Sequence, residues 1–218
     1  MKLSKETLTI LRNFASINPN IMFKKGNTLM TGAANKTCFA VAEIEETIPV
    51  DMGIYDLGEL LGVISIFNDP DLTFTNDTLT ISEGRNKIRY MPADAEVLVY
   101  PKRQVSLPTN DVSFNLPAAQ LQQIIKAGAV LKVPFMTVKG DGSKITVIVH
   151  DKANVNSNQF VIDVDVDSTA EFQMHVKVDN LKMLVEDYFV EVSFNKILQF
   201  TGKKKSYLVT CEIDSSSN

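Results

Sequence analysis

Three aspartates at alternate positions, Asp163, Asp165 and Asp167, form the densest group of potential metal ligands in the sequence. Side chains two residues apart on a β-strand point to the same face, so this spacing gathers the carboxylates together. Calcium usually takes about 6–8 oxygen ligands from a curved loop, which a straight strand does not supply. We therefore expect a solvated strand face whose charge discourages pairing at a sheet edge, with a metal-dependent enzyme as the alternative.

The other residue types that catalyse reactions do not form a recognisable constellation. The sequence has no Gly-x-x-x-x-Gly-Lys-Ser/Thr loop for phosphates, no His-Glu-x-x-His motif and no cysteine pair at metal-binding spacing. Its two histidines, His150 and His175, fall in predicted strands, where we expect solvated or hydrogen-bonded side chains. No serine, cysteine or histidine has a motif that marks a nucleophile. The sequence therefore predicts no catalytic residue, no metal and no cofactor.

Basic residues at helical spacing suggest a different chemistry, contact with phosphates. Opposite the apolar stripe of a predicted helix over residues 3–17 lie Lys5, Thr9, Arg12 and Ser16, and a later helix places Lys126 beside two glutamines. An ordinary solvated helix face explains either helix alone. A repeated basic face in an acidic protein favours sequence-independent contact with phosphates. No aromatic residues interleave with these basic residues, so base stacking is not indicated.

The composition is that of a soluble globular protein. Of the 218 residues, 44% are hydrophobic, which supplies a core, while the net charge of −4 argues against holding nucleic acid by bulk attraction. Two distant cysteines, Cys38 and Cys211, and the lack of a signal peptide or membrane span predict a reducing cytoplasm. We expect solvated surfaces at Glu43, Glu45 and Glu46 and in the Lys203–Lys205 turn, and disorder only in the tail Ser215–Asn218.

Strands dominate the predicted secondary structure, and helices interrupt them at four places. Period-two alternation over 145–149, 171–178 and 188–194 indicates strands that each bury one face. Helical stripes fall within 3–17, 57–64 and 117–131, and 179–184 is a possible short fourth helix. Ser4 and Asp56 are the expected N-caps of the first two helices. Close alternation of strands and turns predicts antiparallel sheets in an α+β fold.

An internal repeat follows from these positions. Ile10-Leu11-Arg12 matches Ile124-Ile125-Lys126, and Met22 matches Met136 at the same separation of 114 positions. Helix, strands, helix and strands therefore occur twice, which indicates a duplicated domain. Breakers and polar residues mark the join. We predict an N-terminal domain over 1–103, a connector over 104–113 and a C-terminal domain over 114–218.

Several segments, in order along nearly the whole chain, resemble the sliding clamps of large tailed bacteriophages. The similar segments of the first half are Met1-Lys2-Leu3-Ser4-Lys5, Asn13-Phe14-Ala15, Ile17-Asn18, Ile21-Met22, Met30-Thr31, Asn35, Ile54-Tyr55-Asp56-Leu57, Leu61-Gly62, Ser65 and Asn68-Asp69. Those of the second half are Leu121-Gln122-Gln123 and the Asn180-x-Lys182-Met183 segment.

The resemblance implies a DNA clamp fold with two similar domains per chain. Three chains would close into a ring, with antiparallel sheets outside and helices lining a central hole through which double-stranded DNA passes. Lys5, Arg12 and Lys126 would face the DNA, with Lys2, Lys132 and Lys182 as further candidates. A sparse set of mobile cations suits sliding, because tight phosphate contacts would act as a brake.

The resemblance also implies partners: a DNA polymerase, an ATP-driven clamp loader and the phage late-transcription machinery. Partner tails would dock beside the connector, at Val105, Leu107 and Pro108. Subunit contacts would use predicted strands that contain Val97, Val99, Phe172, Met174 and Val176. Loop and core packing is the alternative explanation of both sets.

A β-rich structural protein of the virion is the main alternative function. It would also lack catalytic residues, but it has no need for a repeated basic helix face or for DNA polymerase, so a pull-down with the polymerase separates the two. For the metal enzyme, alanine substitution of the three aspartates without loss of metal binding would remove the hypothesis.

Overall fold

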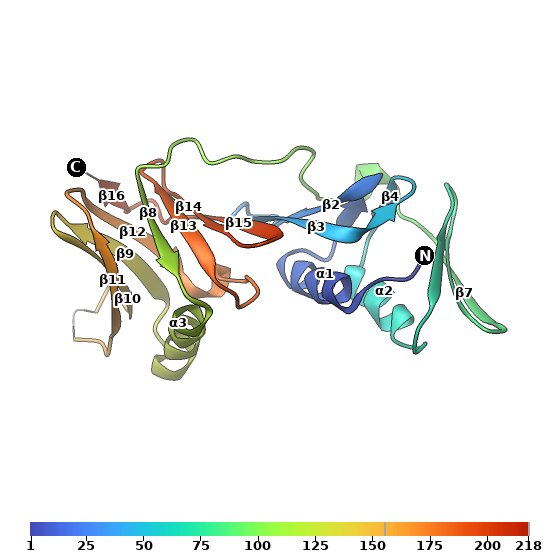
Figure 1. The fold of residues 1–218 in the computed structure, drawn as a ribbon, viewed down its shortest axis with the longest axis horizontal. Helices are drawn as coiled ribbons and strands as arrows, with labels where there is room; N and C mark the ends of the chain where they lie inside the picture. Colours follow the sequence, from blue (N-terminus) through green and yellow to red (C-terminus); the bar gives the residue numbers. More distant parts are fainter. Residues whose placement is uncertain (155, 218) are drawn as a thin grey trace. The chain divides into compact units, whose positions relative to one another are not determined.

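The computed structural model describes residues 1–154 and 156–217, with the side chains of all of these except Asp165 and Asp167. The chain divides into two compact units, Met1–Gln104 and Val105–Asn218. Figure 1 shows antiparallel strands and a small number of helices in each unit. None of the helices in the described part of the chain is long and apolar enough to cross a bilayer.

Unit 1 contains two helices, seven strands and one 3₁₀ turn. In chain order they are α1 (Lys5–Ile17), β1 (Ile21–Phe23), β2 (Gly26–Gly32), β3 (Cys38–Ile48), β4 (Met52–Ile54), α2 (Leu57–Ile64), β5 (Asp71–Phe74), β6 (Leu79–Glu83), β7 (Asn86–Tyr90) and η1 (Ala95–Val97). Strand β1 pairs with β4, β2 pairs with β3, and β5, β6 and β7 form a three-stranded sheet. Helices α1 and α2 pack against each other, as Figure 1 shows.

Unit 2 repeats this order with one helix fewer. Its elements are β8 (Val112–Leu116), α3 (Ala118–Leu131), β9 (Phe135–Asp141), β10 (Lys144–His150), β11 (Phe160–Asp167), β12 (Glu171–Lys177), η2 (Val178–Asn180), β13 (Tyr188–Ser193), β14 (Ile197–Thr201), β15 (Lys205–Thr210) and β16 (Ser216–Ser217). One sheet has the order β11-β10-β9-β12-β16, and β8, β13, β14 and β15 pair consecutively in another.

Strand pairing makes the duplication visible. Of the four strands that follow α1, the second pairs with the third and the first pairs with the fourth. The four strands that follow α3 pair in the same combinations. In each unit the next three strands form an antiparallel meander. The strand pattern of the predicted repeat therefore occurs twice, whereas its second helix forms only in unit 1.

The two predicted N-caps are confirmed. The Ser4 side chain accepts a hydrogen bond from the Thr7 amide at 3.1 Å and starts α1. The Asp56 carboxylate accepts one from the Glu59 amide at 3.0 Å and starts α2. Each side chain satisfies one of the amide donors that a helix leaves open in its first turn, so both helices begin where local chemistry dictates.

The possible fourth helix over 179–184 is absent. Only the single turn η2 forms, and the chain then runs extended, with Leu181 and Met183 each 5% exposed and Lys182 between them exposed. The Tyr188 hydroxyl donates a hydrogen bond of 2.6 Å to the carbonyl of Leu184 and fixes the end of this segment. Burial at every second residue is the period of an extended chain, which explains why no helix forms.

The described part of the C-terminal tail is ordered, contrary to the expectation from its composition. Residues Ser216 and Ser217 form the edge strand β16 on β12, and the Ser215 side chain is buried. The Ser215 hydroxyl accepts a hydrogen bond from the His175 amide at 3.0 Å. The open edge of β12 supplies backbone partners, so even small polar residues gain structure there.

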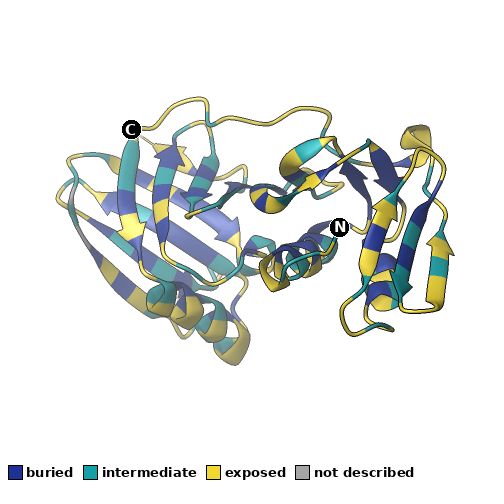
Figure 2. Cartoon of the chain, turned by 45° about the vertical axis from the view of Figure 1, so that its right-hand side comes forward, coloured by how far each residue is buried: buried dark blue, intermediate teal, exposed yellow. Residues whose placement is uncertain are grey.

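Burial in both units follows the alternation that the sequence predicts for half-buried strands. Figure 2 shows buried and exposed residues alternating along the strands of unit 2. In β10, for example, Ile145, Val147 and Val149 are fully buried. Their neighbours on the other side of the strand remain accessible, so one face of the sheet forms the core and the other stays at the surface.

Candidate nucleic-acid interface

Helix α1 presents an uninterrupted polar stripe on the side opposite its core residues. Lys5, Thr9, Arg12 and Ser16 are all exposed, while Ile10, Leu11 and Phe14 are at most 1% exposed. Lys5 and Arg12 lie seven residues apart on one face, which is about 10 Å along a helix. Neither cationic group has an ion pair or hydrogen bond among the described residues. Both charges are therefore available to an external anion.

Helix α3 offers the corresponding face in unit 2. Gln122, Gln123 and Lys126 are exposed, and Leu121 and Ile124 are fully buried. No acidic residue occurs between Ala118 and Leu131, so nothing on the helix itself neutralises Lys126. The predicted pairing of Arg12 with Lys126 in the repeat thus corresponds to two exposed cations on equivalent helices.

A distant carboxylate anchors the start of each of these helices. Glu46, near the end of β3, accepts hydrogen bonds from the Ser4 amide and from the Thr7 hydroxyl, the latter at 2.6 Å. In unit 2 the Asp187 carboxylate accepts a hydrogen bond of 2.8 Å from the Ala118 amide. Negative charge at a helix N-terminus is favourable, so these side chains hold α1 and α3 on their sheets.

The electrostatics of Glu46 agree with this anchoring role. Burial works to raise the pKa of the carboxyl, but the hydrogen bonds from Thr7 and Ser4 outweigh it and leave the pKa below its ordinary value. The expectation that Glu46 is merely solvated is therefore wrong. No sequence signal marks it, because its partners lie about 40 positions away.

The three further DNA-facing candidates occupy different surroundings. Lys2 is exposed, but its ammonium pairs with the Asp69 carboxylate, and this hydrogen bond raises the pKa of Lys2. Lys132 is the exposed C-cap of α3 and has left-handed backbone, with φ of 54°. Lys182 is exposed in the extended segment that replaces the predicted fourth helix. The Asp69 carboxylate therefore already balances the charge of Lys2.

The proposed partner-docking residues lie in a segment without regular secondary structure. Val105 is 43% exposed, Leu107 is half-buried and Pro108 is exposed. Beyond them the chain is fixed to unit 2, where the Thr109 hydroxyl lies 2.7 Å from the Ser193 hydroxyl. Their role in docking remains a prediction.

The candidate subunit-contact residues divide into two groups. Val97 and Val99 are 59% and 54% exposed, but Val97 belongs to the 3₁₀ turn η1 rather than to a strand, because the Asp94 carboxylate caps that turn. On β12 the side chains of Phe172, Met174 and Val176 are at most 3% exposed and face the core of unit 2. For these three the structure favours the alternative of core packing, and for Val97 and Val99 a role in subunit contact remains a prediction.

Two charged clusters from the sequence can now be placed. Asp163 is exposed and pairs with Lys144 at 3.2 Å, whereas the side chains of Asp165 and Asp167 lie outside the described residues. In the lysine turn, Lys205 is not solvated: its side chain is 8% exposed and pairs with Glu186 at 2.8 Å. This ion pair joins the start of β15 to the chain just before β13.

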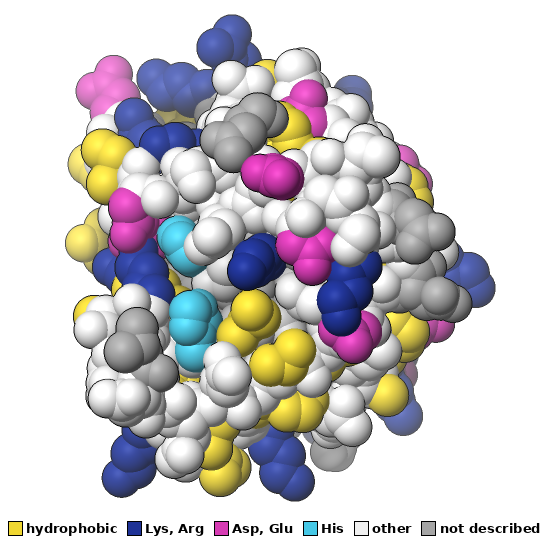
Figure 3. Space-filling model, turned by 90° about the vertical axis from the view of Figure 1, so that its left-hand side faces the viewer, with side chains coloured by type: hydrophobic (Ala, Val, Ile, Leu, Met, Phe, Trp, Pro, Cys, Tyr) yellow, Lys and Arg dark blue, Asp and Glu magenta, His cyan; other side chains and the backbone are white. Residues whose placement is uncertain are grey.

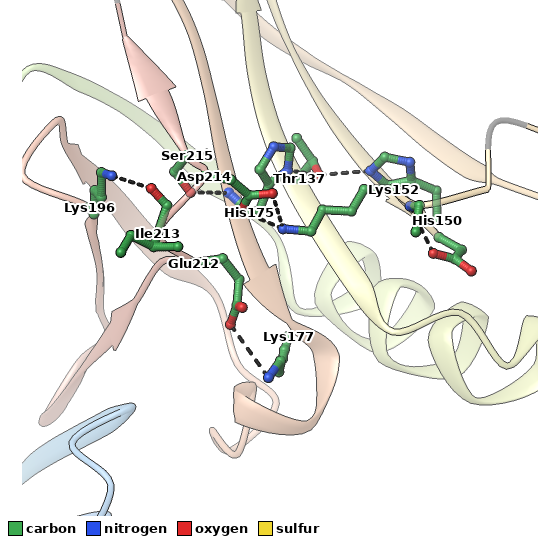
Figure 4. Close-up of polar contacts among 12 residues, drawn as sticks. Thr137, His150, Lys152, His175, Lys177, Lys196, Glu212, Ile213, Asp214 and Ser215 are labelled. Atoms are coloured by element: carbon green, nitrogen blue, oxygen red, sulfur yellow. Dashed lines mark hydrogen bonds and ion pairs between the residues drawn. The ribbon is translucent and has the colours of Figure 1, made fainter.

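A polar cluster holds the C-terminal segment against the outer side of a sheet in unit 2. Figure 3 shows the two histidines close together on this face, beside basic and hydrophobic side chains. Figure 4 shows the Thr137 hydroxyl between them, 2.8 Å from His150 Nε2 and 2.7 Å from His175 Nδ1. Lys152 pairs with Asp214 of the C-terminal segment. Burial lowers the pKa of both histidines, so the cluster favours their neutral forms.

Comparison with known proteins identifies the class to which this fold belongs. A structure described as the C-terminal region of FEN-1 bound to A. fulgidus PCNA matches with a TM-score of 0.74 and 13% identity, covering 99% of this chain and 100% of that one. The β chain of DNA polymerase III from Streptococcus pneumoniae matches with a TM-score of 0.71 and 13% identity, covering 97% of this chain and 64% of that one. The fold is therefore that of the DNA clamps, as the resemblance implied.

Sequence comparison narrows the class. A family model described as DNA polymerase processivity factor matches residues 4–100. The sliding clamp of Enterobacteria phage T4 is 30% identical, and 99% of each chain is covered. The chain belongs to the sliding clamp family of DNA polymerase processivity factors. The predictions of a clamp and of a non-enzymatic protein are confirmed by this membership, and a β-rich structural protein is not supported.

Proposed function

We propose that three copies of this chain join head to tail into a closed ring around double-stranded DNA and tether the replicative DNA polymerase to it. An ATP-driven clamp loader would open and close this ring in the host cytoplasm. The observation that carries the proposal is the repeated cationic helix face: Lys5 and Arg12 on α1 and Lys126 on α3 are exposed, and none of them pairs with an anion among the described residues. Family membership supports the tethering role.

The charge distribution suits sliding better than tight binding. The chain carries a net charge of −4, so its overall charge does not attract DNA, and the exposed cations on two helices supply the attraction. Each phosphate contact releases counterions and strengthens binding, so many contacts would hold the protein at one place. A sparse set keeps the duplex centred while the closed ring, rather than affinity, prevents its escape.

Charge reversal tests this proposal. The variant Arg12→Glu with Lys126→Glu should load poorly and shorten the products of primer extension by the polymerase several-fold. Its deficit relative to wild type should shrink at higher salt, because salt screens the attraction that the variant has lost. The matched control, Lys25→Glu with Lys203→Glu, changes the net charge equally at exposed positions outside α1 and α3 and should retain long products. Equal products from both variants would contradict the role of the two helices.

A further inference from the structure

Two buried asparagines at the end of helix α1 hold a distant stretch of backbone in unit 1. Asn18 and Asn20 are 4% and 8% exposed, although burying a polar side chain is costly unless it is hydrogen-bonded. Asn18 Nδ2 donates a hydrogen bond of 2.8 Å to the Val99 carbonyl, and the Val99 amide donates one of 2.9 Å to Asn20 Oδ1. Both backbone groups of a residue 81 and 79 positions away are therefore bound by these side chains.

Further hydrogen bonds fix the two asparagine side chains themselves. Asn18 Nδ2 also donates to the Gly32 carbonyl at 2.8 Å, and Asn18 Oδ1 accepts from the Asn20 amide at 2.9 Å. Asn20 Nδ2 donates to the Tyr55 carbonyl at 2.6 Å. Neither amide can turn without breaking several of these bonds, so the pair presents a rigid donor and a rigid acceptor to Val99.

The residue before Val99 adds an apolar anchor. Leu98 is 8% exposed, and a Cβ built on Gly53 of β4 would lie 2.7 Å from the Leu98 Cδ1 atom. The glycine therefore leaves the space that this side chain fills. The Val99 side chain, by contrast, is 54% exposed. Unit 1 holds the backbone of Val99 and leaves its side chain outside, so these contacts position the chain rather than bury Val99 in a core.

After Val99 the chain loses its hydrogen bonds and regains them in unit 2. Within the described part of the chain, no hydrogen bond or ion pair involves residues 100–108, the bridging segment. Beyond it, the Asp111 amide donates to the Val192 carbonyl at 3.0 Å, and the Asp111 carboxylate accepts from the Phe194 amide at 2.7 Å. The bridging segment is thus tied at both ends and unbonded in between.

Tied ends limit the conformations that the bridging segment can adopt. The segment contains the partner-docking candidates Val105, Leu107 and Pro108, and its backbone groups are open to an extended peptide. A partner that binds an ordered segment loses less conformational entropy than one that must order it, so tied ends strengthen binding. Release of one end would spread the segment over many conformations and weaken the same contacts.

We propose that Asn18 and Asn20 are positioning residues for partner capture: they fix Val99, and so hold the bridging segment ready for an extended apolar segment of the replicative DNA polymerase. The inference rests on the proposed function, because it concerns how the polymerase is tethered. It gives the end of the cationic helix α1 a role in addition to contact with DNA.

Alanine substitution with a stability control tests this role. Asn18→Ala and Asn20→Ala should each raise the Kd for the immobilised full-length polymerase encoded in the same genome about five- to tenfold, because binding must then order the bridging segment. Leu60→Ala is the control: Leu60 lies among core residues of unit 1, so its loss lowers stability but should leave the Kd unchanged. Equal weakening by all three variants would overturn the positioning role.

Limited proteolysis gives a local measurement of the same effect. Lys102 and Arg103 in the bridging segment are exposed, so trypsin can cleave after either. Cleavage there, mapped by mass spectrometry, should be several-fold faster in both asparagine variants, because a protease cuts the population that has left the ordered state. If both variants fail to fold, Asp111→Ala at the other end carries the test, since Asp111 is exposed.

Light scattering and circular dichroism keep this inference apart from the proposed function. Each folded variant should assemble as wild type does, because the substitutions change the bridging segment and not the ring. Variants that bind the polymerase and resist trypsin as wild type does would show that the positioning role is wrong, and the proposed function would stand. A wild-type protein that neither assembles nor binds the polymerase would overturn both.

Discussion

The clearest difference between the two repeats lies in the segment between the fourth strand and the closing meander. In unit 1 this segment is α2, which begins at the Asp56 cap and buries Leu57, Leu60 and Ile64. In unit 2 it is the short turn η2 followed by extended chain that buries Leu181 and Met183. Equivalent segments of the two repeats therefore have different backbone conformations.

The comparison shows that this position requires buried apolar side chains more than it requires a helix. The extended chain of unit 2 compensates for missing helical hydrogen bonds through side chains, since Tyr188 binds the Leu184 carbonyl at 2.6 Å. The η2 turn also packs very closely on α3, where a Cβ built on Gly128 would lie 2.7 Å from Val178 Cγ1. By contrast, α1 packs against a regular helix, α2, at the equivalent place in unit 1.

The largest expected effect is loss of these buried side chains. Leu60→Ala in α2 and Met183→Ala in the extended segment should each lower the free energy of unfolding by about 3 kcal/mol, because each leaves a cavity in a core. Urea unfolding measures both. Val185→Ala, 48% exposed, is the control and should cost little. A Met183→Ala variant as stable as the control would show that the extended segment does not replace α2.

The next effect compares two helical glycines. Gly128→Ala in α3 should destabilise unit 2 by about 2 kcal/mol, because the added methyl group meets Val178. Gly62→Ala in α2 should stabilise unit 1 by up to about 1 kcal/mol, since a methyl group there meets nothing within 4 Å and alanine favours the helix. Thermal unfolding measures whether each substitution raises or lowers the stability of its unit. A Gly128→Ala variant that is more stable than wild type would contradict the close packing of η2 on α3.

These contrasts explain what the sequence alone could and could not predict. Ser4 and Asp56 were predicted as caps because each cap bonds within three residues, and local chemistry is readable in sequence. The prediction of a fourth helix was wrong, because the alternating burial of Leu181 and Met183 has the period of an extended chain.

Long-range partners escaped prediction for a different reason. Glu46 and Asp187 reach helix starts far away in the sequence, and the β16 strand depends on the free edge of β12. In the candidate site, the exposure of Lys5, Arg12 and Lys126 could be predicted, because their helical spacing places them opposite the apolar stripe. The apolar face of β12 was assigned to a subunit contact because the same alternation describes a core strand and an interface strand.

The two anchoring carboxylates should contribute smaller amounts. Glu46→Ala should cost about 1–2 kcal/mol and Asp187→Ala about 1 kcal/mol, since each leaves helix-start donors without a charged acceptor. Chemical unfolding measures the loss. Glu43→Ala, exposed on the same strand as Glu46, is the control and should change stability little. Equal effects at positions 43 and 46 would remove the anchoring role.

The smallest effect is a pH dependence confined to unit 2, which holds both histidines. Burial lowers the pKa of His150 and His175 in the folded protein, so the unfolded chain binds protons first. Stability should therefore be complete above about pH 6.5, the unfolded value, and should fall as pH drops below it. Neighbouring Lys152 lowers the pKa of both histidines further, while Asp151 and Asp214 oppose it.

Hydrogen exchange at pH 7.5 and pH 5.5, corrected for intrinsic rates, measures this effect unit by unit. Protection should fall in β9, β12 and the C-terminal segment of unit 2 and stay nearly constant in unit 1. The double variant His150→Gln with His175→Gln should flatten the response. An equal loss of protection in both units would assign the pH dependence to groups other than the histidines.

Retention on circular DNA tests the central claim most directly. The wild-type protein should be loaded onto a nicked circular plasmid with its loader and ATP, and passed through gel filtration in high salt. A closed ring should remain with the circle and be lost when one restriction cut linearises it, because only topology holds it there. Equal retention on circular and linear DNA, or none on either after loading, would contradict encirclement.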